Sequence, residues 1–199
     1  KGGHGAMPHL TRDAIVIGSQ LVTNLQQIVS RRVDPIESAV ISVGNFVSDN
    51  AFNVSADRAK LGGTVRTFSA EVRDLIEEEI ERVVRGTCEA ANAEYTYQYS
   101  RGYSPVINHE AETEFLKEFA KTVPGVTEVK EIPPTMGGED FAYYLEHVPG
   151  TFFFTGAQDP NWEVTYPHHH PKFNIDERGM LIAAKTLGGV TLKAMKEDL

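Results

Sequence analysis

Two histidines stand in a glycine-rich run near the start of the sequence, Gly2-Gly3-His4-Gly5-Ala6-Met7-Pro8-His9. Imidazole is the side chain that most readily gives or takes a proton near neutral pH. A histidine in such a loop can donate a hydrogen bond to a developing oxyanion or bind a ligand. The alternative is that both rings simply form hydrogen bonds to backbone carbonyl groups. The pattern alone does not decide between these two interpretations.

A second candidate combines an amide with a guanidinium. Asn53 lies in a predicted loop, and Arg66 lies in the predicted strand that follows it. A guanidinium can pair with both oxygens of a carboxylate, and an amide adds a further donor. The two side chains suit a substrate with a free carboxylate, although Arg66 on a strand face could equally be a solvated charge.

The third candidate is the run Met136-Gly137-Gly138-Glu139-Asp140-Phe141. Two glycines before a helix leave free N–H groups beside the positive end of the helix dipole, where an anion can bind. Acidic residues are also common in the first turn of any helix. The run therefore fits either an anion site or an ordinary helix start.

Three consecutive histidines, His168-His169-His170, precede Pro171. Neutral histidine is a frequent metal ligand. Adjacent side chains rarely all point at one ion, so a single ligand is more plausible than three.

The elements that must position these groups follow from the spacing of apolar residues. Helical periodicity is found at residues 12 to 31 and at about 69 to 92. Strand composition or alternation is found at residues 36 to 47, 59 to 68 and 94 to 100. If one more strand precedes Lys1, the order is β-α-β-β-α-β, a ferredoxin-like open sheet with both helices on one face.

Beyond a linker at Gly102 to Pro105 the pattern changes. Asn108 can cap a helix that ends at Pro124-Gly125. Strands are predicted near 126 to 132 and at 151 to 155, and a short helix from Glu139 to His147. A final helix begins at Asp176, with an inner face made of Met180, Ala184, Leu187, Thr191 and Met195. These are pieces of an α/β layer that lacks some of its partners.

Charge and composition exclude several classes of partner. The net charge of -9 argues against a nucleic-acid surface and against attraction to anionic lipid. No apolar run approaches the length of a membrane span. The one cysteine, Cys88, fits a reducing compartment and a cytoplasmic protein.

Taken in order, the segments KGGHGAMPH, NVSADRAKLGGTVRTF, MGGEDFAYY and HHHPKFNIDE resemble the metal-dependent aminoacylases and N-acyl-amino-acid amidohydrolases of the metallopeptidase-like family. The subgroup of hippurate hydrolase, N-acetyldiaminopimelate deacetylase and auxin-conjugate hydrolase is the most similar. The resemblance covers the whole chain and only the C-terminal half of such an enzyme. It implies an α/β protein in which residues 1–103 form a ferredoxin-like α+β lid and dimerisation domain without its first strand. Residues 104–199 would form the C-terminal part of a zinc-peptidase-like α/β catalytic domain.

The resemblance also implies roles for individual residues. His4 matches the lid histidine that reaches the substrate carbonyl of the neighbouring subunit, which makes it the catalytic candidate. Asn53 and Arg66 match the residues that hold the substrate carboxylate. Gly137 and Gly138 match a turn that lines the substrate pocket through its backbone.

His169 matches the last ligand of a centre of two divalent metal ions, zinc or manganese, whereas His168 and His170 have no counterpart. The other ligand segment and the glutamate pair of such enzymes do not occur in this sequence. The general base and most metal ligands would then precede Lys1. The chain alone would be inactive, and metal-free or weakly loaded.

The sequence departs from the family at one loop. Asn53 is followed by Val54-Ser55-Ala56-Asp57, where the family usually reads Asn-Val-Ile-Pro-Asp. The missing proline leaves this loop less stiff.

The expected function of the intact protein is therefore metal-dependent hydrolysis of the amide bond of an N-acyl amino acid or a related small conjugate. The enzyme would be a homodimer joined through the lid, with no nucleic acid or membrane partner. The alternative is a non-catalytic dimerisation or binding module, because one ligand cannot build a zinc site.

Overall fold

The computed structural model describes residues 1–197, which form two compact units. Unit 1 comprises Lys1–Pro105 together with Thr135–Gly138. Unit 2 comprises Val106–Pro134 together with the described residues from Glu139 onward. Within this described part, no helix has the length and apolar character needed to cross a bilayer.

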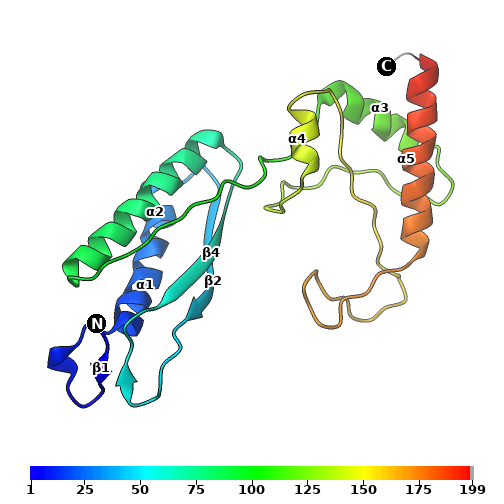
Figure 1. The fold of residues 1–199 in the computed structure, drawn as a ribbon. Helices are drawn as coiled ribbons and strands as arrows, with labels where there is room; N and C mark the ends of the chain where they lie inside the picture. Colours follow the sequence, from blue (N-terminus) through cyan, green and yellow to red (C-terminus); the bar gives the residue numbers. More distant parts are fainter. Residues whose placement is uncertain (198–199) are drawn as a thin grey trace. The chain divides into compact units, whose positions relative to one another are not determined.

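An antiparallel hairpin is the centre of unit 1 (Figure 1). Strand β2 (Ala39–Val47) pairs with β4 (Lys60–Thr67), and the register places Val40 opposite Arg66 and Val47 opposite Lys60. The register shifts between Val43 and Asn45, where the ladder has an irregularity typical of a β-bulge. The hairpin agrees with the two strands predicted at residues 36 to 47 and 59 to 68.

Two helices cover one face of this hairpin (Figure 1). Helix α1 (Ala14–Arg32) begins after Asp13, whose side chain accepts a hydrogen bond from the Ile15 amide. Helix α2 (Ala70–Ala90) begins after Ser69, whose side chain accepts one from the Val72 amide. These caps satisfy amides that have no partner inside the helix. The buried apolar residues at the interface form the core, and they are Leu21, Leu25, Ile28, Val33, Val72, Ile76 and Val84.

A second, smaller ladder belongs to the same unit. Strand β1 (Gly3–His4) pairs antiparallel with β3 (Val54–Ser55). The 3-10 helix η1 (Pro8–Leu10) follows β1 and leads into α1.

The strand predicted at residues 94 to 100 is not formed. Its alternation is present, because Tyr97 and Tyr99 are half-buried and their neighbours are exposed. The segment is held by side chains instead of a ladder: the Tyr97 hydroxyl donates to the Glu77 carbonyl at 3.4 Å, and Arg101 pairs with Asp74 at 2.8 Å. A strand needs a neighbour for its backbone groups, and no described strand pairs with this segment.

Unit 2 consists of helices and irregular chain in the part that the structure describes. Its helices are α3 (Glu110–Ala120), α4 (Phe141–Leu145) and α5 (Arg178–Glu197). The ring of Phe119 lies close to Gly189, so α3 and α5 pack together. The strands predicted at 126 to 132 and 151 to 155 are not formed.

Two further predictions for unit 2 are wrong. Residue His109, not Asn108, is the N-cap of α3, and Asn108 instead makes two hydrogen bonds of 2.8 Å to the backbone of Phe152. The side chains assigned to the inner face of α5 are largely on its outside: Met180 is 54% exposed, Leu187 60% and Met195 72%. The buried positions of α5 are Gly179 and Thr186.

Candidate functional site

The backbone places His4 directly beside Asn53. In the ladder between β1 and β3, His4 is opposite Val54, the residue that follows Asn53. The next amide, that of Gly5, donates to the Asn53 carbonyl oxygen at 2.9 Å. The structure thus brings together two of the residues singled out from the sequence.

The hydrogen bond of the His4 ring fixes which nitrogen carries the proton. Nδ1 accepts from the Ala6 amide at 3.2 Å, so a neutral ring must hold its proton on Nε2. The side chain is exposed, and no described residue accepts from Nε2. The interpretation in which backbone carbonyl groups satisfy this ring does not hold for His4. An imidazole with a free Nε2–H can donate to a carbonyl oxygen that becomes negative.

A different pair forms around Arg66. The segment Thr135–Gly138 belongs to unit 1, although it is far from β4 in sequence. A Cβ atom added to Gly138 would lie 3.0 Å from Arg66 Nη1 and 3.3 Å from its Cζ. Glycine is therefore what allows this backbone to lie against the half-buried guanidinium. Gly137 is exposed, and a Cβ atom added there would meet only the Thr135 hydroxyl, at 3.9 Å.

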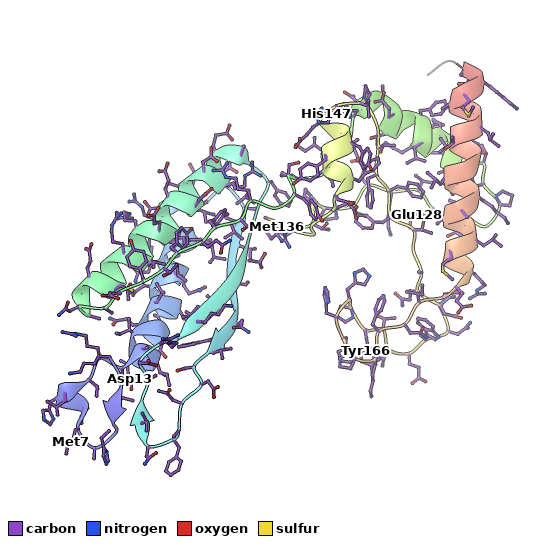
Figure 2. All side chains as sticks on the ribbon, in the orientation of Figure 1. Met7, Asp13, Glu128, Met136, His147 and Tyr166 are labelled. Carbon is purple, nitrogen blue, oxygen red and sulfur yellow. The ribbon has the colours of Figure 1, made fainter. Side chains whose placement is uncertain are left out.

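The two pairs lie at opposite ends of the hairpin. Arg66 pairs with Val40 where β2 begins, and the loop with Asn53 follows the other end, where Val47 pairs with Lys60. At about 3.3 Å per residue, the strand from Lys60 to Arg66 alone spans roughly 20 Å. In Figure 2, Met7 and Met136 mark these two ends of unit 1. Within one copy of the chain, Asn53 and Arg66 are not brought together.

In unit 2, the three histidines of residues 168 to 170 have different surroundings. The His170 ring stacks on Tyr166 with centroids 4.3 Å apart, and its Nδ1 accepts from the Lys172 amide at 3.0 Å. The His168 ring meets Phe173 edge to face at 4.7 Å. The structure gives His169 no hydrogen bond or ring contact with any described residue, and its φ of 68° lies in the left-handed region. A non-glycine residue in this region is uncommon and is often functional.

The described residues do not by themselves fit a metal centre. Among residues 1–197, no group of three or more His, Cys, Asp or Glu side chains is arranged to hold an ion. Catalytic zinc needs three protein ligands. His169 is available as one ligand, and the described chain supplies no neighbours for it.

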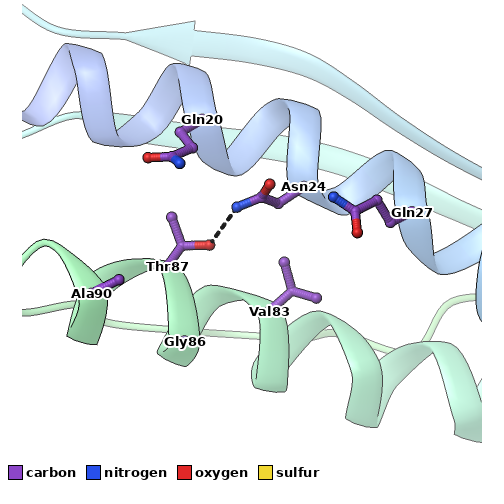
Figure 3. A pocket seen from close by; sticks show the side chains of 7 residues that line it. All are labelled: Gln20, Asn24, Gln27, Val83, Gly86, Thr87 and Ala90. Carbon is purple, nitrogen blue, oxygen red and sulfur yellow. Dashed lines mark hydrogen bonds between the residues drawn. The ribbon is translucent and has the colours of Figure 1, made fainter.

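A polar hollow between α1 and α2 was not anticipated from the sequence (Figure 3). It has a volume of about 320 Å³ and is lined by Gln20, Asn24, Gln27, Val83, Gly86, Thr87 and Ala90. The amide of Asn24 donates across it to the Thr87 hydroxyl at 3.0 Å. The signal in the sequence is the spacing of the three amides, which places them on one face of α1. None of the predicted site residues lines this hollow, and no charged side chain does. We therefore interpret it as a polar contact between the two helices.

An imidazole that can donate from Nε2 suits a developing oxyanion, and an arginine packed against the Gly138 backbone suits a carboxylate. Comparison with known proteins shows the family. The chain belongs to peptidase family M20/M25/M40, whose family model matches residues 3–193.

Two curated relatives are similar over nearly all of the chain. "Putative amidohydrolase YhaA" of Bacillus subtilis (strain 168) is 58% identical over 192 residues, which is 96% of this chain and 48% of that protein. N-acetyldiaminopimelate deacetylase of Priestia megaterium is 41% identical over 183 residues, 92% of this chain and 47% of that protein. The chain spans about half the length of the curated relatives it matches.

Two solved structures of similar proteins also match nearly all of the chain. The crystal structure of a "putative aminohydrolase" from methicillin resistant Staphylococcus aureus has a TM-score of 0.75 and 40% identity, covering 97% of this chain and 49% of that one. The Bacillus subtilis protein YXEP, described as a dinuclear metal binding peptidase from the M20 family, has a TM-score of 0.64 and 27% identity, covering 92% of this chain and 47% of that one. The structure described above is therefore an α/β portion of the M20 peptidase fold, as the resemblance in the sequence predicted.

Proposed function

We propose that the intact protein hydrolyses the amide bond of an N-acyl amino acid, or of a related small conjugate with a free carboxylate. The observation that carries this proposal is the division of the substrate-binding groups into two pairs, one suited to a carbonyl oxygen and one to a carboxylate. The relative named as an N-acetyldiaminopimelate deacetylase supports the same substrate class.

In this proposal His4 is the catalytic residue. Its Nε2–H donates to the carbonyl oxygen of the scissile amide, and the hydrogen bond strengthens as that oxygen becomes negative in the tetrahedral transition state. The bond from the Ala6 amide to Nδ1 keeps the ring in the tautomer that can donate.

Arg66 holds the substrate carboxylate, since a guanidinium can bind both carboxylate oxygens. The backbone of Gly138 lies against this guanidinium, and Gly137 and Gly138 would line the substrate pocket through their backbone. Asn53 adds an amide donor from the end of unit 1 that carries His4.

A single site must then be built from two copies of the chain. Arg66 is separated from the end of the hairpin that carries His4 and Asn53 by roughly 20 Å along β4, which exceeds the length of a small N-acyl amino acid. His4 and Asn53 of one copy would therefore meet Arg66 and Gly138 of the other. A two-fold symmetric homodimer forms two such sites at once. Residues 1–103 would be the ferredoxin-like lid that joins the copies, and residues 104–199 the C-terminal part of the catalytic domain.

His169 would supply one ligand to a centre of two divalent ions, zinc or manganese. The relative described as a dinuclear metal binding peptidase supports this assignment. When bound, such ions activate water and polarise the substrate carbonyl. The remaining ligands and the general base would lie outside this chain, so residues 1–199 alone would be inactive and metal-free or weakly loaded. The lone buried Cys88 is consistent with a cytoplasmic enzyme.

Complementation between two inactive variants of the intact protein tests the shared site. In a mixed dimer of His4→Ala and Arg66→Ala copies, one site contains both substitutions and the other contains neither. With random pairing, half of the dimers are mixed, and each has one intact site out of two. We therefore expect coexpression to restore about a quarter of the wild-type activity, as two-fold symmetry requires.

If both groups instead come from the same copy, every site of the mixed dimer keeps one defect and activity is not restored. That result would contradict the shared site. Full activity of both single variants would contradict the proposed function itself.

A further inference from the structure

The loop that carries Asn53 is held from two sides by the rest of unit 1. On one side, the Gly5 amide donates to the Asn53 carbonyl oxygen at 2.9 Å. On the other, the Asn50 side chain lies 3.2 Å from the Ala56 amide and 2.9 Å from the Asp49 carbonyl, and both are satisfied when its amide oxygen faces Ala56 and its nitrogen faces Asp49. Ala56 is fully buried, and its carbonyl accepts from the Ala14 amide at the start of α1 at 3.1 Å.

The contact at Gly5 leaves no room for a side chain. A Cβ atom there would lie 2.8 Å from the Asn53 carbonyl oxygen and 3.2 Å from its carbonyl carbon. Both are backbone atoms, so the backbone of Asn53 would have to move. Conformation is not the reason for glycine, because the φ of Gly5 does not lie in the positive range. The reason is the close approach of two backbones.

Gly44 provides a contrast within the same unit. It is an exposed glycine of β2, and a Cβ atom added there would meet nothing within 4 Å. A methyl group at position 44 therefore adds a side chain to a strand of unit 1 without displacing a neighbour.

We propose that Gly5 is a positioning residue, whose missing side chain seats the Asn53 loop against β1 and so fixes the distance between the Asn53 amide and the His4 ring. Asn50 holds the same loop from its other side. This role rests on the proposed function, in which His4 and Asn53 act on one substrate molecule. It explains why a loop without proline can still place Asn53 accurately, because hydrogen bonds to β1 and α1 supply the stiffness.

The test compares Gly5→Ala with Gly44→Ala in the intact protein, measuring kcat and KM on an N-acetyl amino acid and the melting temperature. We expect kcat of Gly5→Ala to fall about 10–100-fold, because displacing a reacting group by about 1 Å costs up to about 10²-fold. Gly44→Ala should keep the wild-type kcat. In an Asn53→Ala background, Gly5→Ala should have a much smaller effect, since two substitutions that act through one group are not additive.

If Gly5→Ala does not fold, Asn50 provides the second test. Asn50→Ala removes the acceptor for the Ala56 amide and should lower kcat, whereas Asn50→Asp retains that acceptor and should restore most of it. The positioning role is overturned if Gly5→Ala matches Gly44→Ala, or if Asn50→Ala and Asn50→Asp are equally active. An Asn53→Ala variant with full activity would contradict the role of Asn53 in the proposed function. Failure of the positioning role alone would leave Asn53→Ala impaired, so the two outcomes can be told apart.

Discussion

Unit 1 and unit 2 differ in how completely each one pairs its strands and buries its own apolar side chains. Unit 1 contains a hydrogen-bonded hairpin, two capped helices and a buried core centred on Ile28 and Ile76. In unit 2, α5 has exposed large apolar side chains along its length, including Leu181 and Leu192. The described part of unit 2 contains no strand, although its sequence has two segments with strand composition.

The difference follows from where each element finds its hydrogen bonds. A helix satisfies most of its backbone groups internally, whereas a strand needs a neighbouring strand. Unit 1 contains both strands of its hairpin within 30 residues of sequence, so it forms a sheet and positions the groups assigned to the substrate. In the proposed function, unit 2 would supply His169 as a single metal ligand. On this basis, unit 1 should control substrate chemistry and unit 2 should control metal binding.

Substitution of one histidine in each unit tests that division with the largest expected effect. In the intact protein, His4→Ala should lower kcat by about 10²–10³-fold, the usual loss for one oxyanion donor, and should leave the metal content unchanged. His169→Ala should lower the metal content measured by mass spectrometry. If His4→Ala lost as much metal as His169→Ala, the assignment of substrate chemistry to unit 1 and metal binding to unit 2 would be wrong.

The second prediction concerns a buried carboxylate in unit 1. Glu79 is 6% exposed and accepts hydrogen bonds from Arg32 at 3.1 Å and from Arg82. The hydrogen bond from Arg82 is the main reason that the pKa of Glu79 lies below its ordinary value of 4.5, and Arg32 lowers it further. Glu79→Gln should cost about 1–3 kcal/mol at neutral pH, near the lower end because both arginine side chains are half exposed.

The pH dependence of this effect has a definite sign. The folded pKa is depressed, so the carboxylate stabilises unit 1 above about pH 4.5 and loses this contribution as the pH falls through the folded value. The difference in melting temperature between wild type and Glu79→Gln should therefore shrink as the pH falls from 7 to 3. A difference that stays constant over this range would show that packing, rather than charge, stabilises the site.

The helices of both units could be predicted from sequence because their apolar periodicity is local. Helix α2 begins one residue from its predicted start, and α5 begins two residues late. Residues 94 to 100 were predicted as a strand, and from residue 96 to 100 half-buried tyrosines do alternate with exposed polar residues. Burial of Tyr97 against α2 raises the pKa of its hydroxyl to about 12. Alternation records which side is buried, but it does not supply a pairing partner.

For the candidate site, sequence motifs select residues but not their grouping. The motifs single out His4, Asn53, Arg66 and His169, because the proposed chemistry needs an imidazole, an amide and a guanidinium. Their arrangement depends on the β2–β4 register, which places Arg66 at one end of the hairpin and Asn53 beyond the other. A register is a long-range property, and no spacing within either motif encodes it.

The smallest predicted effects compare helical glycines of the two units. A Cβ atom at Gly86 in α2 or at Gly188 in α5 would meet nothing within 4 Å. Gly86→Ala and Gly188→Ala should each stabilise the protein by about 0.5–1 kcal/mol, because alanine loses less backbone entropy in a helix. At Gly189 a Cβ atom would lie 2.5 Å from the Phe119 ring. Gly189→Ala should therefore be less stable than Gly188→Ala in urea unfolding. If the two are equally stable, the Phe119 ring moves at little cost, and α3 and α5 pack more loosely than the helices of unit 1.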